Sequence, residues 1–159
     1  MRNVKHKPFQ NPSGAADFTA YHAIKNIEKA CPAALVRFET DIPPSVNHAY
    51  ITTRKGQRIL TNAAKMWVLY AGIKAKTAAQ KHGWAFSSSG KLVMEIWAYW
   101  PDNKKRDIHN LHKLIADAFE DILYKDDRNV LIRDMDFYID RENPRVEICV
   151  RGFSCDDGK

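Results

Sequence analysis

The sequence predicts an α/β (α+β) fold in two layers, with a mixed four-stranded sheet covered on one face by two helices. Strand-like and long helical segments alternate along the chain in the order β-α-β-α-β-β. Strand–helix–strand units favour right-handed crossovers between parallel strands. The last two strand-like segments are separated only by a turn sequence, which adds an antiparallel pair to the sheet.

The chain has 159 residues, enough for one compact domain with its own hydrophobic core. We expect a basic leader with a short helix over 1–33, one globular domain over 34–152 and a polar tail over 153–159. The leader helix is predicted over 17–30, because apolar side chains recur there at spacings of three: Phe18, Tyr21, Ile24 and Ile27.

The net charge of +6 favours a polyanionic partner such as nucleic acid. The three cysteines lack C-x-x-C spacing, which argues against a disulfide framework or a zinc site and fits a reducing cytoplasm. No apolar run approaches the roughly 18 residues of a membrane helix, and the N-terminus has no signal-peptide pattern. We therefore expect a cytoplasmic protein that has no membrane partner.

The first strand is predicted over 35–42, where side chains alternate until Pro43 and Pro44 end the segment. Residues 50–53 and 58–60 predict a hairpin, with Gly56 supplying the positive φ of the loop. The hairpin carries Arg54, Lys55 and Arg58. These cations fit either a solvated tip or a contact with a phosphate backbone.

A long helix is predicted over 62–82, with Thr61 as the N-cap and Gly83 at the C-terminal end. Its predicted buried stripe consists of Met66, Trp67, Val68, Tyr70, Ile73 and Thr77. Residues 91–100 are nearly all apolar, which predicts a central strand. The segments 130–140 and 145–151 predict an antiparallel hairpin across the turn 141–144.

Between the central strand and this hairpin, an amphipathic helix is predicted to begin after Asp107. At about 100° per residue, one arc carries the core side chains Ile108, Leu111, Ile115, Ala118, Phe119 and Ile122. The opposite arc carries Asn110, Lys113, Asp117 and Asp121. His109 lies away from the core arc and can approach a metal at the helix start, whereas His112 is predicted to face solvent.

Acidic residues bracket this helix. Asp107 follows a buried strand, a position typical of an N-cap and also of catalytic groups. Asp126 and Asp127 repel each other unless solvent or a hard cation such as Mg²⁺ compensates, so they indicate either a surface turn or a metal site. Lys113 fits either charge stabilisation during phosphoryl transfer or a helical ion pair with Asp117.

Three blocks of sequence, in this order and at these separations, resemble the RusA family of Holliday junction resolvases. They are P-P-S-V-N-H-A-Y over 43–50 with its basic hairpin, R-D-I-H-N-L-H-K over 106–113 with Asp117 and Ala118, and the pair Asp126–Asp127. The resemblance covers about 42–148. It implies a RusA-like endonuclease domain of bacterial or phage origin.

The resemblance further implies that Asp107 and Asp127 are metal-binding catalytic carboxylates, that Lys113 is the catalytic lysine, and that Asn110 and Asp117 support them. Asp126 is a further candidate ligand. The family's second aspartate is replaced here by His109, whose imidazole suits Mn²⁺ better than Mg²⁺. We expect Mg²⁺ as the cofactor, with Mn²⁺ as the alternative.

The expected function is structure-selective resolution of four-way DNA junctions by metal-dependent phosphodiester hydrolysis, in recombination and repair, by a homodimer. The expected DNA contacts are Asn47, Arg54, Lys55, Arg58, Lys104, Lys105 and Arg106. One alternative is a branched-DNA-binding protein of the same fold without turnover. A nucleotide phosphohydrolase is a third interpretation, but it leaves the basic hairpin without a role.

Overall fold

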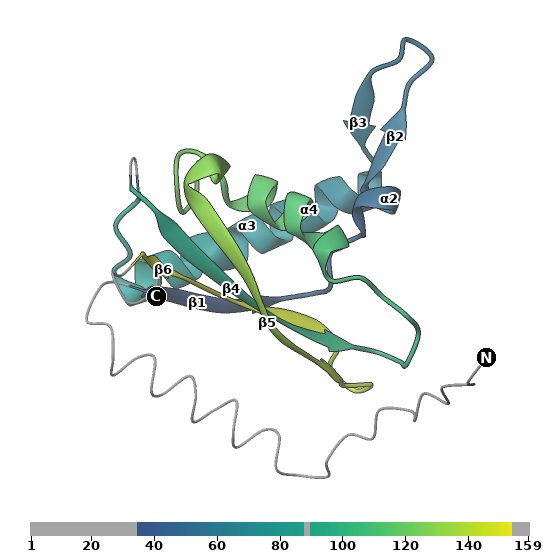
Figure 1. Ribbon diagram of the computed structural model, residues 1–159. Coiled ribbons are helices and arrows are strands. Elements are labelled where there is room, and N and C mark those ends of the chain that lie inside the picture. The colour runs from purple at the N-terminus through teal and green to yellow at the C-terminus, as the bar shows by residue number, and fades with distance from the viewer. Residues whose placement is uncertain (1–34, 88–89, 154–159) are drawn as a thin grey trace, which may run out of the picture. The chain divides into compact units, whose positions relative to one another are not determined.

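The computed structural model describes residues 35–87 and 90–153, and in this part of the chain two helices cover one face of a four-stranded sheet (Figure 1). The elements in order are β1 (Leu35–Thr40), α2 (Val46–Ala49), β2 (Tyr50–Thr52), β3 (Arg58–Leu60), α3 (Asn62–His82), β4 (Leu92–Trp100), α4 (His109–Phe119), the 3₁₀ turn η1 (Asp127–Asn129), β5 (Val130–Ile139) and β6 (Arg145–Gly152). The predicted leader helix lies outside the described residues, and the predicted domain boundaries stay predictions.

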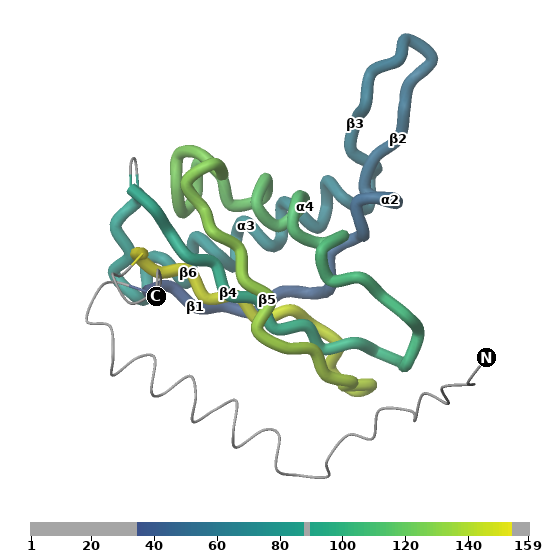
Figure 2. Tube along the Cα trace, viewed as in Figure 1, coloured from purple at the N-terminus to yellow at the C-terminus, as the bar shows by residue number. Residues whose placement is uncertain are grey.

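The strands lie in the order β1-β6-β4-β5, and the sheet is mixed (Figure 2). β4 runs parallel to β5 and antiparallel to β6, while β1 runs antiparallel to β6. The two-layer mixed sheet and the parallel β4-α4-β5 unit are therefore confirmed. Every residue of β4 is buried, as expected for an apolar central strand.

The predicted hairpin between the last two strands is wrong, because β4 lies between β5 and β6. β4 is apolar on both faces, so burial favours a hydrogen-bonded neighbour on each of its sides. The turn after β5 therefore carries the chain across β4 rather than back along β5. The sequence identifies the turn between β5 and β6, but it does not show that β4 lies between these two strands.

The ends of α3 are confirmed, but its predicted buried stripe is only partly right. Trp67 is buried and Val68 packs against the core, as expected, whereas Met66, Tyr70, Ile73 and Thr77 are exposed. The Thr61 hydroxyl accepts a hydrogen bond from the Ala64 amide, and Gly83 has φ of 63°. The buried side chains are mostly small: Ala64, Trp67, Ala71, Gly72, Ala75 and Ala78. At Gly72 an added Cβ would lie 2.9 Å from Ile122 Cδ1, so close packing of α3 against the segment after α4 selects the small residues.

The large apolar side chains of α3 point outward as a consequence. Met66, Leu69, Tyr70 and Ile73 are between 48% and 56% exposed, and they follow helical spacing along one side. We call these four residues the α3 apolar row. No helix within 35–87 and 90–153, α3 included, has the length and apolar character to cross a bilayer.

α4 is shorter than predicted. It ends at Phe119, and Asp121 has φ of 61°, so Asp121 does not extend the polar row of the helix. The returning segment is fixed to α4 by the Tyr124 hydroxyl, which donates to the Ala116 carbonyl at 2.8 Å in the core. This contact positions the carboxylates that follow Tyr124.

The basic hairpin is confirmed as β2 and β3, with Gly56 at φ of 78°. It extends away from the two-layer body (Figure 2). At its base the Arg58 guanidinium lies 4.3 Å from the centre of the Tyr50 ring, a cation–π contact.

Candidate active site

The segment between β4 and α4 is organised by Asp102. Its carboxylate accepts hydrogen bonds from Arg106 Nη1 at 2.5 Å and from the Lys104 amide at 2.9 Å. The hydrogen bond from Arg106 is the main reason that the pKa of Asp102 lies well below its ordinary value. The Arg106 guanidinium also lies 5.3 Å from the Trp100 ring centre. These contacts hold the segment that presents Asp107 at the start of α4.

Asp107 caps the helix and also lines a cavity. Its Oδ1 accepts a hydrogen bond from the His109 amide at 3.0 Å, which is the capping interaction. The side chain nevertheless remains 60% exposed. The cavity measures about 340 Å³ and is lined by Ile42, Pro43, Ser45, His48, Trp100, Lys105, Arg106, Asp107, Asn110 and Leu111. Capping therefore does not prevent Asp107 from facing a ligand.

Two histidines and a second carboxylate lie beside Asp107. His109 Nδ1 lies 3.2 Å from Asp107 Oδ1, and His109 Nε2 lies 3.2 Å from Asp134 Oδ2. His112 Nε2 lies 2.7 Å from Asp134 Oδ1, so the prediction that His112 faces solvent is wrong. We call Asp107, His109, His112 and Asp134 the N-terminal cluster of α4.

Sequence reasoning did not single out Asp134. It lies within β5 opposite Ile96, on the sheet face that packs against the helices. A carboxylate at such a position is rarely left without a partner, which is the signal that could have drawn attention to it.

Lys113 and Asp117 lie farther along the same helix. Lys113 Nζ donates to Asp117 Oδ1 at 2.7 Å, and the Tyr50 hydroxyl donates to Asp117 Oδ2 at 3.1 Å. The hydrogen bond to Asp117 raises the pKa of Lys113, and Asp127 raises it further. Burial, followed by the charge of Asp117, raises the pKa of Tyr50. The ammonium of Lys113 is therefore held by the Asp117 carboxylate, and the charge of Asp127 adds to the stabilisation of its protonated form.

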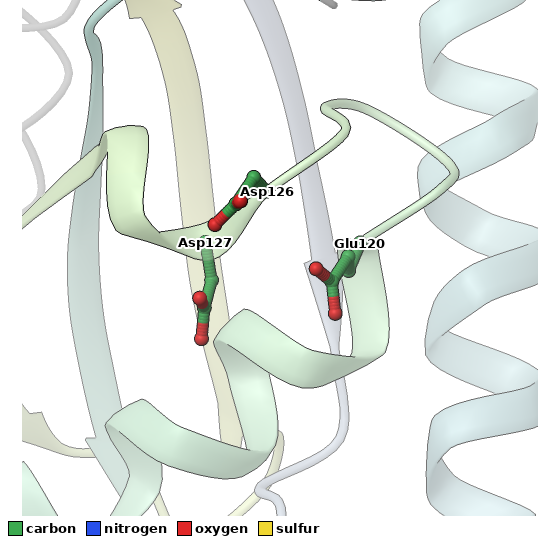
Figure 3. Close-up of side chains that lie close together, drawn as sticks. All are labelled: Glu120, Asp126 and Asp127. Atoms are coloured by element: carbon green, nitrogen blue, oxygen red, sulfur yellow. The ribbon is translucent and has the colours of Figure 1, made fainter.

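Three carboxylates gather after the C-terminal end of α4 (Figure 3). One oxygen each of Glu120, Asp126 and Asp127 lies within 4.8 Å of the others. Arg128 donates to both oxygens of Asp126, at 3.0 and 2.5 Å, and lowers the pKa of Asp126 to about 2. The Asp127 side chain points toward α4 (Figure 3), in keeping with its effect on Lys113. Sequence reasoning missed Glu120, the residue that follows α4.

The predicted site residues therefore divide into two clusters along one helix. Asp107 precedes α4 in the sequence and Asp127 follows it, but the charge of Asp127 acts on Lys113 in the middle of the helix. The N-terminal cluster lies at the first end. Lys113, Asp117 and the carboxylates of Figure 3 lie toward the second end. Asn110 lies between them on the wall of the cavity.

The residues predicted to contact DNA are all exposed. Three belong to the hairpin, namely Arg54, Lys55 and Arg58, and Asn47 lies on α2. Lys104, Lys105 and Arg106 precede Asp107, and the last two line the cavity. Basic side chains thus lie on the hairpin and at the rim of the cavity.

Comparison with known families agrees with this arrangement. The model of the family Endodeoxyribonuclease RusA matches residues 41–151, which is more than half of the chain. A search of curated proteins gives no match. The matched range contains the hairpin, α4 and both clusters. The chain therefore belongs to the endodeoxyribonuclease RusA family.

Proposed function

We propose that this protein resolves four-way DNA junctions by divalent-metal-dependent hydrolysis of phosphodiester bonds, in DNA recombination and repair. Membership of the RusA family implies a Holliday junction-resolving endonuclease that acts on branched DNA. The observation that carries the finer proposal is the polar side of α4. There Asp107 and Asn110 line a cavity, and Lys113 lies farther along, where it donates to Asp117 and is affected by the charge of Asp127.

The donors at both ends of α4 fit a divalent cation. Carboxylate oxygens suit Mg²⁺, and the imidazole of His109 extends the range to Mn²⁺. A bound cation would act as a Lewis acid toward the phosphate and lower the pKa of a bound water. We propose that Asp107 and Asp127 are the essential carboxylates. Arg128 already occupies both oxygens of Asp126, which favours Asp127 over Asp126.

Lys113 has the position and the charge to stabilise the anion that develops on the phosphate during hydrolysis. Asp117 fixes its ammonium group, and Tyr50 fixes Asp117. Asp117 and Tyr50 are therefore positioning residues in the proposed mechanism.

The basic side chains fit the backbone of a branched DNA substrate. Arg54, Lys55 and Arg58 lie on a hairpin that extends from the body, where they can contact phosphates without reading bases (Figure 2). Lys104, Lys105 and Arg106 lie beside the proposed catalytic carboxylate Asp107. We propose that the first group holds a DNA arm while the second guides the strand that is cut.

A four-way junction contains two equivalent strands, which suits a two-fold symmetric enzyme. The α3 apolar row supports a homodimer, because four exposed large apolar residues on one helix side could be buried against the same row of a second copy. We propose that two copies associate through this row.

A synthetic four-way junction, incubated with the protein in Mg²⁺ and separately in Mn²⁺, tests the proposal. We expect symmetric nicks near the crossover, no cutting of a linear duplex of the same sequence, and no cutting by Asp127→Asn. Cutting by Asp127→Asn at the wild-type rate would exclude this site.

The same assay distinguishes a non-catalytic DNA-binding protein, an alternative favoured by one observation. His109 stands where the resemblance to the family leads us to expect an aspartate. Retarded but intact junction in both metals would identify such a protein.

A further inference from the structure

One face of the β2–β3 hairpin packs against the domain, and the other face is exposed. Successive side chains of a strand point to opposite faces, so Tyr50 and Ile51 lie on different faces of the hairpin. Tyr50 and its partner Leu60 pack against the hydrophobic core. Ile51 pairs with Ile59, and these two residues are 53% and 39% exposed. The hairpin therefore carries two adjacent aliphatic side chains on its outer face.

The base of the hairpin is bonded to two helices. The Tyr50 hydroxyl donates to Asp117 Oδ2 on α4 at 3.1 Å, and the Thr61 amide donates to the Ala49 carbonyl of α2 at 2.9 Å. The Arg58 guanidinium lies 4.3 Å from the Tyr50 ring centre on the anchored face. Beyond this base the hairpin extends away from the sheet and the helices (Figure 1). These contacts fix the direction of the hairpin relative to α4, the helix of the proposed active site.

The charge of the hairpin indicates what kind of partner would cover the two isoleucines. Arg54, Lys55 and Arg58 are exposed, and residues 50–60 include no acidic residue. A second copy of the hairpin carries the same charges, so like-charge repulsion opposes contact between two hairpins. A polyanion with apolar surfaces between its charges fits both features, and stacked bases between phosphates are such a surface.

We propose that Ile51 and Ile59 form an apolar wedge that inserts between bases at the crossover of branched DNA, while Arg54 and Lys55 bind the flanking phosphates. Aliphatic side chains inserted at a base step unstack the bases and bend the DNA. Unstacking costs least where stacking is already interrupted, as it is at a crossover. The wedge therefore favours branched over linear DNA without reading a base sequence. This inference rests on the proposed nuclease function for its substrate, but its test measures unstacking rather than cutting.

A four-way junction that carries the fluorescent base 2-aminopurine beside the crossover tests the wedge, because unstacking raises the emission of this base. The full-length protein is added in Ca²⁺ in place of Mg²⁺, and a linear duplex with the same label is the reference. We expect emission from the junction to rise by about two-fold or more and emission from the duplex to stay unchanged. The double variant Ile51→Ser with Ile59→Ser should lose most of this rise.

Binding measurements separate the wedge from the cations. The double isoleucine variant should bind the junction about 10-fold more weakly with an unchanged salt dependence, because no phosphate contact is lost. Arg54→Gln with Lys55→Gln should instead reduce the slope of log affinity against log salt by about 2. Leu131→Ser, which removes an aliphatic side chain that is 46% exposed on β5, is the matched control and should match the wild type in emission and affinity. Circular dichroism confirms that each variant is folded.

The outcomes distinguish the wedge from other uses of the two isoleucines. Emission that rises equally with the wild type and the double isoleucine variant, or that is lost equally in Leu131→Ser, would overturn the wedge. A double variant that sediments as a smaller species than the wild type would overturn it as well, since the isoleucines would then join two copies. So would a double variant that binds the junction normally but no longer binds vesicles of anionic lipid.

The same measurements distinguish the wedge from the nuclease proposal. Symmetric cutting of the junction by a protein that leaves the emission unchanged would overturn the wedge and leave the nuclease proposal standing. An isoleucine-dependent rise in emission from a protein that cuts no junction would support the wedge and overturn the nuclease.

Discussion

Lys113 and Asp117 form an ion pair of 2.7 Å one turn apart on α4, and Asp117 in turn accepts a hydrogen bond from Tyr50 on β2. Such pairs are ordinary on exposed helices and contribute little to stability. This one differs because a third residue from another element fixes the carboxylate, and Asp127 adds its charge at the lysine. The pair therefore restrains the position of a cation.

Replacement of the positively charged Lys113 side chain should affect the cutting of DNA more than the binding of DNA. Lys113→Met should lower the single-turnover rate on a four-way junction by roughly 10²- to 10³-fold, the usual cost of one transition-state donor. The dissociation constant for the junction, measured by mobility shift in Ca²⁺, should change by less than about 10-fold, because we propose that exposed basic residues elsewhere supply the phosphate contacts.

Lys125→Met is the matched control. Lys125 forms an ion pair of the same spacing and length with Asp121, at 2.7 Å, in the loop after α4. The Lys125→Met protein should cut the junction at the wild-type rate. Equal losses of cutting rate in both variants would show that Lys113 contributes only to the net positive charge of the protein and has no specific role at the site.

Asp117→Asn should lower the pKa of Lys113, because the hydrogen bond to that carboxylate is the largest cause of the raised value. Lys113 must be protonated to stabilise an anion, so the alkaline loss of cutting should move to lower pH in the variant. An NMR titration of the Lys113 ammonium checks the shift directly, and Tyr50→Phe should produce a smaller shift of the same sign. If the pKa of Lys113 were unchanged in Asp117→Asn, Asp117 would not be a positioning residue for Lys113.

Much of the fold could be predicted because local signals and burial agree. Thr61 and Gly83 define α3, Gly56 defines the hairpin, and the uninterrupted apolar run of β4 defines the central strand. The order of β5 and β6 could not be predicted from the turn between them, because strand order follows burial of β4 on both sides. The buried side of α3 was predicted only in part, because hydrophobic periodicity does not show that close packing requires small side chains there.

The candidate site was predictable only where its residues share one helix. Periodicity placed Asn110, Lys113 and Asp117 together, and the structure retains that row. Asp134 comes from a strand 22 residues beyond His112, and no local pattern relates the two. The position of Asp127 likewise depends on how the chain turns after α4, where Asp121 adopts the αL conformation.

Removal of one partner from the buried ion pair between β4 and β6 should destabilise the domain strongly. Arg151 Nη2 lies 2.8 Å from Glu95 Oε1, with side chains 9% and 3% exposed. Arg151→Met should lower the free energy of unfolding by about 3–5 kcal/mol, because it leaves Glu95 charged and buried. Urea denaturation measures the change. Glu95→Leu with Arg151→Met should recover most of the loss.

An exposed ion pair provides the comparison. Arg128 is 84% exposed beside Asp126, so Arg128→Met should leave the free energy of unfolding nearly unchanged. If Arg151→Met and Arg128→Met lowered the free energy of unfolding by similar amounts, burial of Arg151 would not explain its contribution to stability.

The α3 apolar row should hold two copies of the protein together. Leu69 is 55% exposed at the middle of the row, and Leu69→Lys would place two charges near the two-fold axis of a symmetric interface. We expect a dimer for the wild type and a monomer for Leu69→Lys in sedimentation equilibrium, with dimerisation weakened by about 30-fold or more, as for an interface hot spot.

Lys65→Glu also changes the charge of α3 but lies outside the row, so this variant should remain dimeric. The junction assay adds a functional readout. A monomeric Leu69→Lys protein should lose paired, symmetric nicks, because only a dimer presents two active sites to the two equivalent strands. Wild-type protein that sediments as a monomer while making symmetric nicks would contradict the role of this row, since both strands would then be cut without the contact.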